Sequence, residues 1–187
     1  MNIFDQQLKN ISSNKIYAAL VDMQFGDSLR STGEKKGIMT NIGIMNPNDL
    51  QTGTVDSFHI NKTGKLIFQQ RLFDSFPRPV QTLSIDIDYT HKNDFLVAGF
   101  GNKEGGLFLM KSEGDGGFSK KMIRALPGAI KTYIEDINND GLPDIQALMS
   151  RLIVSLIPPN QQAKADWKQS RGKKTEILLL RNSSNKK

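Results

Sequence analysis

One segment of the chain recurs 50 residues further along, and this repeat constrains the fold more than any other feature of the sequence. Residues 76–95 align with residues 126–145 without a gap. A fixed period of this length indicates that one supersecondary unit is present in successive copies. The identical or chemically similar pairs are Pro77 and Pro127, Val80 and Ile130, Thr82 and Thr132, Asp86 and Asp136, Ile87 and Ile137, Asp88 and Asn138, and Asp94 and Asp144.

Each unit is predicted to contain about four short β-strands. Short apolar runs, such as residues 95–99, 107–110 and 145–149, are separated by turns rich in Gly, Asn and Asp. No helical periodicity extends beyond about two turns in the body of the chain. We therefore expect an all-β fold of four-stranded blades of about 50 residues, as in a β-propeller. The alternative all-β fold is a sandwich whose internal similarity arose by chance.

The number of units is too small for a closed propeller, which has about 4–8 blades. We therefore expect an incomplete or truncated propeller: a fragment, a shortened gene product, or a chain whose ring of sheets is completed by a partner. The sequence divides into a strand-rich N-terminal part (1–57, a degenerate blade without the acidic turn), the repeat units (58–150), a Pro/Gln/Lys-rich insertion (151–175), and a partial blade strand with a basic tail (176–187).

The net charge of +6 belongs entirely to the C-terminal tail. Residues 164–187 contain 8 basic and 2 acidic side chains, whereas residues 1–163 contain 17 of each. The tail has a single aromatic residue, Trp167, so it lacks the stacking side chains typical of nucleic-acid binding. It is either a solvated stretch or, as an alternative function for the chain, a polyanion- or partner-binding segment.

Several functional classes are disfavoured by the sequence. The chain has no Cys, which excludes disulfides, thiolate zinc sites and cysteine nucleophiles. No apolar run reaches about 18 residues, so we expect no membrane-spanning helix. The first residues lack a continuous apolar segment, so we expect no signal peptide in the sequence as given. Common catalytic motifs are missing, and we expect no enzymatic activity. A carbohydrate-processing enzyme that uses Asp86 and Asp88 is the alternative.

The most specific motif is the loop of residues 136–144, D-x-N-x-D-G-x-x-D. Its oxygen-bearing side chains stand at loop positions 1, 3, 5 and 9, and Gly141 at position 6 permits a sharp turn. An all-oxygen set of this kind is typical of Ca²⁺. The alternative is an Asx-rich turn without an ion. The predicted calcium ligands are Asp136, Asn138, Asp140, the carbonyl group of Leu142, and Asp144.

The upstream copy of this loop is weaker. It keeps oxygen atoms at the same positions, but His91 replaces the glycine and a threonine replaces one carboxylate. We expect it either to bind Ca²⁺ or to be a degenerate structural turn. Its predicted ligands are Asp86, Asp88, Thr90, the carbonyl group of Lys92, and Asp94.

These residues carry a family resemblance. The run DINNDGLPDI at 136–145, with Phe100-Gly101-Asn102 and Gly105-Gly106 after the earlier copy, resembles the bacterial FG-GAP or VCBS repeat of integrin-α-like β-propellers. The resemblance covers about residues 58–150 and, more loosely, 175–185. Residues 1–57 and the long 150–175 connection depart from it.

The resemblance implies a calcium-binding propeller module. In such a module each acidic loop lies between the first two strands of a blade and binds Ca²⁺. The module would act as a non-catalytic scaffold or as a surface for a protein or carbohydrate ligand. An extracellular, periplasmic or cell-surface location is implied as well.

Overall fold

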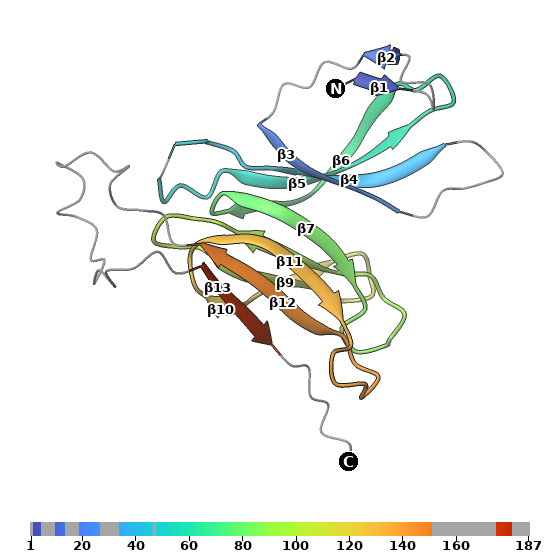
Figure 1. The fold of residues 1–187 in the computed structure, drawn as a ribbon. Helices are drawn as coiled ribbons and strands as arrows, with labels where there is room; N and C mark the ends of the chain where they lie inside the picture. The colour runs from blue at the N-terminus through green and yellow to red at the C-terminus, as the bar shows by residue number, and fades with distance from the viewer. Residues whose placement is uncertain are drawn as a thin grey trace.

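The computed structural model describes residues 2–4, 10–13, 19–26, 34–46, 48–150 and 175–180. The described chain is all-β, as expected: it forms thirteen strands, and no described residue lies in a helix (Figure 1). A short antiparallel pair, β1 (Asn2–Phe4) and β2 (Asn10–Ser13), precedes three larger antiparallel sheets.

The first large sheet has four antiparallel strands in chain order, β3-β4-β5-β6. The predicted boundary between residues 57 and 58 falls inside β5, which spans Gly53–Ile60. This strand pairs with β4 on one side and with β6 on the other, so both sides of the boundary belong to one sheet. The strands are β3 (Leu20–Phe25), β4 (Lys35–Asn41), β5 (Gly53–Ile60) and β6 (Leu66–Phe76).

The second sheet is also a four-stranded antiparallel meander, which confirms the predicted four-stranded sheets. Its strands are β7 (Pro79–Ile85), β8 (Asp94–Gly99), β9 (Gly106–Ser112) and β10 (Phe118–Ala125). The third sheet has three described strands, β11 (Ala129–Glu135), β12 (Asp144–Ser150) and β13 (Thr175–Leu180). The predicted 151–175 insertion and the basic tail lie outside the described residues, apart from β13.

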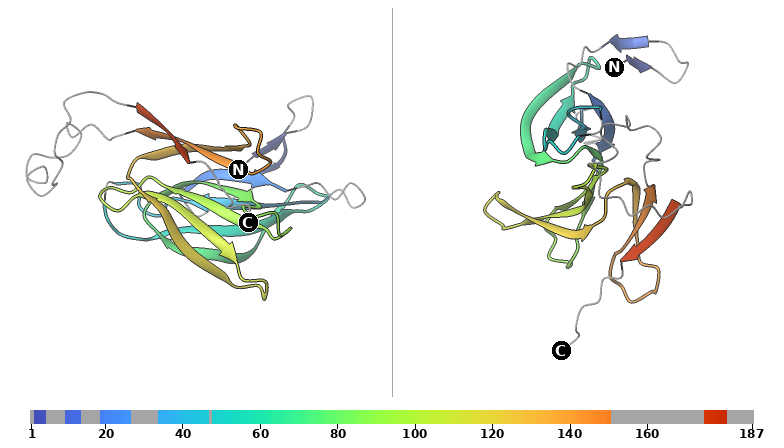
Figure 2. Two further views of the ribbon diagram at one scale, coloured as in Figure 1. Left: turned by 90° about the horizontal axis from the view of Figure 1, so that it is seen from below. Right: turned by 90° about the vertical axis from the view of Figure 1, so that its left-hand side faces the viewer.

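The three large sheets pack face to face in chain order, with an apolar cluster in each of the two interfaces (Figure 2). Strand β8 is buried on both faces, which explains its continuous apolar run. Val97 faces the first sheet, and its neighbour Leu96 faces the third. The first interface includes Val55, Phe73, Phe76, Val97, Phe108 and Met110; the second includes Leu96, Ala98, Leu107, Ala129, Ile145, Ala147 and Met149.

Buried hydrogen bonds join β7 and β11, the first strands of the second and third sheets, to the sheet that precedes each. The hydroxyl group of Thr40 in β4 donates to that of Thr82 in β7 at 2.9 Å. Gln81 Oε1 in β7 accepts from the backbone N–H of Thr132 in β11 at 2.7 Å and from its hydroxyl group at 2.9 Å. All four side chains are buried, so these bonds fix the register of one sheet against the next.

Candidate functional site

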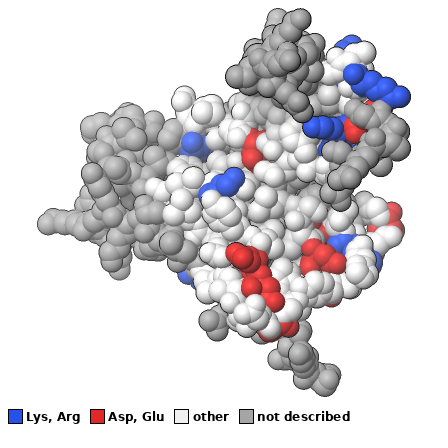
Figure 3. Space-filling model, turned by 45° about the vertical axis from the view of Figure 1, so that its right-hand side comes forward, with Lys and Arg blue, Asp and Glu red and all other residues white. Residues whose placement is uncertain are grey.

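The two acidic loops occupy equivalent places in successive sheets. Residues 86–93 connect β7 to β8, and residues 136–143 connect β11 to β12 (Figure 1). Both loops thus follow the first strand of a sheet and end at the buried carboxylate that begins the second strand. Figure 3 shows acidic side chains gathered on the lower half of the face that it draws.

The Asp136 loop is held by hydrogen bonds to its own side-chain oxygen atoms. Asp136 accepts from the backbone N–H groups of Asp140 at 3.1 Å and Gly141 at 2.7 Å. Asp140 Oδ1 accepts from the backbone N–H of Leu142 at 2.9 Å, and its Oδ2 accepts from Asn138 Nδ2 at 3.0 Å. The residues predicted at positions 1, 3 and 5 therefore lie within one hydrogen-bonded turn.

Position 9 of this loop is Asp144, the first residue of β12. Its side chain is fully buried, and its Oδ2 accepts from the backbone N–H of Ile137 at 3.2 Å. Asp94, at the same position of the other loop, is also fully buried. Ionised carboxylates are rarely buried unless they are paired or hydrogen-bonded, so both positions require a specific electrostatic environment.

The Asp86 loop folds in the same way. Asp86 accepts from the backbone N–H groups of Thr90 at 3.0 Å and His91 at 2.9 Å. The Thr90 hydroxyl group donates to Asp88 Oδ1 at 2.9 Å. The carbonyl group of Lys92, the predicted ligand at position 7, accepts from the backbone N–H of Asp94 at 3.1 Å. One of the two lone pairs of this carbonyl oxygen is thus used within the loop.

Both loops have left-handed backbone at positions 4 and 6. The φ angles are 55° at Tyr89 and 58° at His91, against 56° at Asn139 and 85° at Gly141. The predicted sharp turn at Gly141 is confirmed by this angle. His91 adopts the same region at a conformational cost that glycine does not carry.

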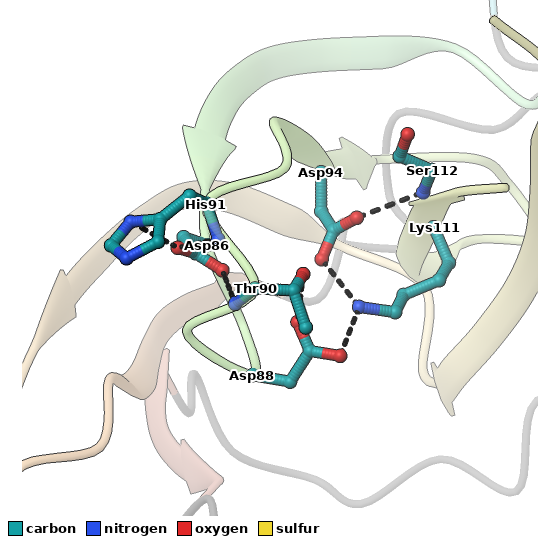
Figure 4. Close-up of polar contacts among 7 residues, drawn as sticks. All are labelled: Asp86, Asp88, Thr90, His91, Asp94, Lys111 and Ser112. Carbon is teal, nitrogen blue, oxygen red and sulfur yellow. Dashed lines mark hydrogen bonds and ion pairs between the residues drawn. The ribbon is translucent and has the colours of Figure 1, made fainter. Parts of the chain in front are cut away.

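The side chain of a lysine that sequence reasoning missed reaches from β9 to the Asp86 loop (Figure 4). Lys111, near the end of β9, places its Nζ 2.6 Å from Asp88 Oδ2 and 3.0 Å from Asp94 Oδ2. The hydrogen bond with Lys111 holds the pKa of Asp88 below its ordinary value. Partial burial acts to lower the pKa of Lys111, but the hydrogen bonds with Asp88 and Asp94 outweigh it, and the pKa lies above its ordinary value.

Sequence proximity gives no signal for this lysine, because it follows Asp94 by 17 residues. The contact depends on the register of β8 and β9, which pairs Phe95 with Met110 and so brings the next residue, Lys111, alongside Asp94. In the third sheet, Ile145 pairs in the same way with Leu180. The residue that follows Leu180 lies outside the described residues.

The donor set of the Asp136 loop fits a hard cation in its chemistry. It offers carboxylate, amide and carbonyl oxygen atoms, which Ca²⁺ prefers. In the part of the chain that the structure describes, however, no three His, Cys, Asp or Glu side chains form a group that could hold a metal ion. The carboxylates of Asp136, Asp140 and Asp144 therefore do not form such a group by themselves, and the amide group of Asn138 and the carbonyl group of Leu142 would have to complete the shell.

Comparison with known proteins gives no match: no family model, curated protein or solved structure matches this chain. Within the described ranges, no helix is long and apolar enough to cross a membrane.

Proposed function

We propose that the chain is a calcium-binding repeat module of the β-propeller type. It acts as a non-catalytic scaffold that presents a surface to a protein or carbohydrate ligand. The observation that carries this proposal is the recurrence of one acidic turn, with the same left-handed positions, between the first two strands of two successive sheets.

The arrangement of the sheets supports the propeller type. Each large sheet is an antiparallel meander that packs face to face on the next one in chain order. The buried polar contacts of Gln81 and Thr82, both in β7, join the second sheet to β11 and to β4. Radial repetition of four-stranded sheets is the construction principle of a propeller.

The oxygen chemistry of the Asp136 loop supports calcium. Asp136, Asn138, Asp140, the carbonyl group of Leu142 and Asp144 would hold the ion. Each carboxylate oxygen can accept more than one bond, so the hydrogen bonds to backbone N–H groups leave acceptor capacity. A bound Ca²⁺ ion would offset two of the three negative charges of the carboxylates and cross-link the turn to the start of β12. Extracellular calcium modules bind with dissociation constants of about 10⁻⁴–10⁻³ M, which suits the location that the resemblance implies.

The non-catalytic assignment is supported by the contacts of the two carboxylates that could otherwise act on a glycoside. Asp86 accepts two backbone N–H groups of its own loop. Asp88 is bound to Thr90 and Lys111. These contacts stabilise the turn, and this structural role accounts for the positions of both carboxylates.

Calorimetric titration with Ca²⁺ tests the proposal. The wild-type chain should bind Ca²⁺ at the Asp136 loop, and the double variant Asp136→Ala/Asp140→Ala should lose that binding. At a hundredfold excess over Kd the ion should stabilise the wild-type chain by about 2.7 kcal/mol, which raises its melting temperature by roughly 5–10 °C.

The matched control is Asp74→Ala/Asp115→Ala, which removes two exposed carboxylates outside both loops. It should keep the wild-type calcium response. Identical heats and melting temperatures for the wild type and the Asp136→Ala/Asp140→Ala variant would refute the site.

A further inference from the structure

The ammonium group of Lys111 stands among the oxygen atoms that the sequence assigns to a second calcium ion. It contacts Asp88 and Asp94, which hold positions 3 and 9 of that predicted site (Figure 4). One positive charge, carried by the chain itself, therefore already bridges the two sides of the loop.

We propose that Lys111 is the resident cation of the Asp86 loop: its ammonium group cross-links Asp88 and Asp94 in place of calcium, and this loop takes no metal ion. The inference goes beyond calcium binding at the Asp136 loop and does not depend on it. The Asp86 loop would then be independent of calcium, whereas the Asp136 loop would respond to the ion.

The burial of Asp94 gives the first reason. Its carboxylate is fully buried, whereas that of Asp88 is 44% exposed. Asp94 Oδ1 accepts the backbone N–H of Ser112 at 2.8 Å, and Oδ2 is bound by Lys111. Adjacent residues of β9 thus supply both partners, and together they offset the hydration that this carboxylate lost on burial.

The other predicted ligands give the second reason. Thr90, at position 5, brings no negative charge, and its hydroxyl group acts as a donor to Asp88. The carbonyl group of Lys92 accepts from the backbone N–H of Asp94. A calcium ion would have to displace an ammonium group that is tethered within the site and hence present at a high effective concentration.

The hydrogen bonds that hold the turn itself do not involve Lys111. The first carboxylate of each loop accepts from the backbone N–H groups of positions 5 and 6, at 3.0 and 2.9 Å for Asp86 and at 3.1 and 2.7 Å for Asp136. Lys111 therefore connects the tip of the loop to the start of β8. Its removal should weaken the contacts of Asp88 and Asp94.

Thermal unfolding in EDTA tests the cross-link with full-length variants. Lys111→Met keeps much of the side-chain length but removes the charge, and it should lower the melting temperature by about 5 °C or more, because it leaves Asp94 buried without its cation. Lys111→Arg, which keeps the charge, should recover part of that loss. The matched control Lys121→Met, an exposed lysine on β10, should leave the melting temperature nearly unchanged.

A double-mutant cycle separates the ion pair from general packing. Asp88→Asn should cost less in the Lys111→Met background than in the wild type, because the two changes remove the same interaction. If Lys111→Met melts like the wild type in EDTA, Lys111 is not the resident cation and the proposal fails.

Calcium stoichiometry provides a readout that holds even if Lys111→Met does not fold. Asp88→Asn should leave the number of calcium ions bound per chain unchanged, and a decrease by one would overturn the proposal. A gain of one calcium ion by Lys111→Met over the wild type would support it. A wild type that binds no calcium, together with a destabilised Lys111→Met, would defeat the proposed function but support the lysine cross-link.

Discussion

At the residue scale, the two acidic loops share a left-handed backbone at position 6 but place different residues there. Gly141 adopts a φ angle of 85°, and a Cβ atom built there would meet no other atom within 4 Å. His91 adopts 58° with a side chain that is 94% exposed. The cost of a side chain at this position is therefore conformational rather than steric.

Reciprocal exchanges should move stability in opposite directions. Gly141→Ala should lower the free energy of unfolding by about 1 kcal/mol, because alanine is strained at positive φ. His91→Gly should raise it by as much as about 0.5–1 kcal/mol through relief of that strain, less the extra flexibility of the unfolded chain. Urea denaturation in EDTA measures both without any contribution from metal.

Gly26→Ala is the control for the loss of a glycine as such. Gly26 lies outside the left-handed region, and a Cβ atom added there would lie an ordinary 3.8 Å from the Lys36 carbonyl oxygen. This variant should not be destabilised as Gly141→Ala is. Equal losses at Gly26 and Gly141 would show that the turn geometry is not the cause.

At the scale of strands and loops, the sequence predicted those features that a local pattern of residues marks. The apolar run at 95–99 lies within β8, because a strand buried on both faces is apolar at nearly every position. The run at 145–149, which Gln146 interrupts, lies within β12. The boundary predicted at residue 57 falls within β5, since β3 to β6 lack the acidic repeat that marked the other units. Lys111 escaped prediction because its contact with Asp94 exists only through the pairing of β8 with β9.

At the scale of strands, Gln81 links β7 to β11, and its replacement should weaken the contact between these two strands. Gln81→Leu introduces an apolar side chain of similar size and leaves the backbone N–H of Thr132 buried without its acceptor. Such a loss costs about 1–3 kcal/mol in the free energy of unfolding. The control Gln69→Leu, at an exposed position of β6, should stay within about 0.5 kcal/mol of the wild type.

Urea denaturation with amide exchange decides the role of Gln81. We expect the amide of Thr132 to exchange faster in Gln81→Leu, since its acceptor is gone. Protection of Thr132 at the wild-type level would mean that another group takes over the bond, and the two sheets would then not be registered by Gln81.

At the scale of the whole molecule, the second sheet is shared by two separate apolar clusters. Phe76 of the first sheet contacts Phe108 with ring centroids 5.4 Å apart, on one face of the second sheet. Ala147 and Met149 of the third sheet pack on the opposite face. In a stack of repeated units, stability is approximately a sum of unit and interface contributions. Each interface should therefore respond separately to mutation.

Leu96 and Val97 allow this to be tested within one strand, because they are adjacent, fully buried and on opposite faces of β8. Leu96→Ala should cost about 2–5 kcal/mol and speed amide exchange chiefly in β11 and β12. Val97→Ala should cost roughly 1–3 kcal/mol and speed exchange chiefly in β5 and β6. If either variant accelerates exchange equally in the first and third sheets, the stack unfolds as one cooperative unit. Distinct patterns would instead establish that each interface holds its own pair of sheets, as expected when successive units contact only their neighbours.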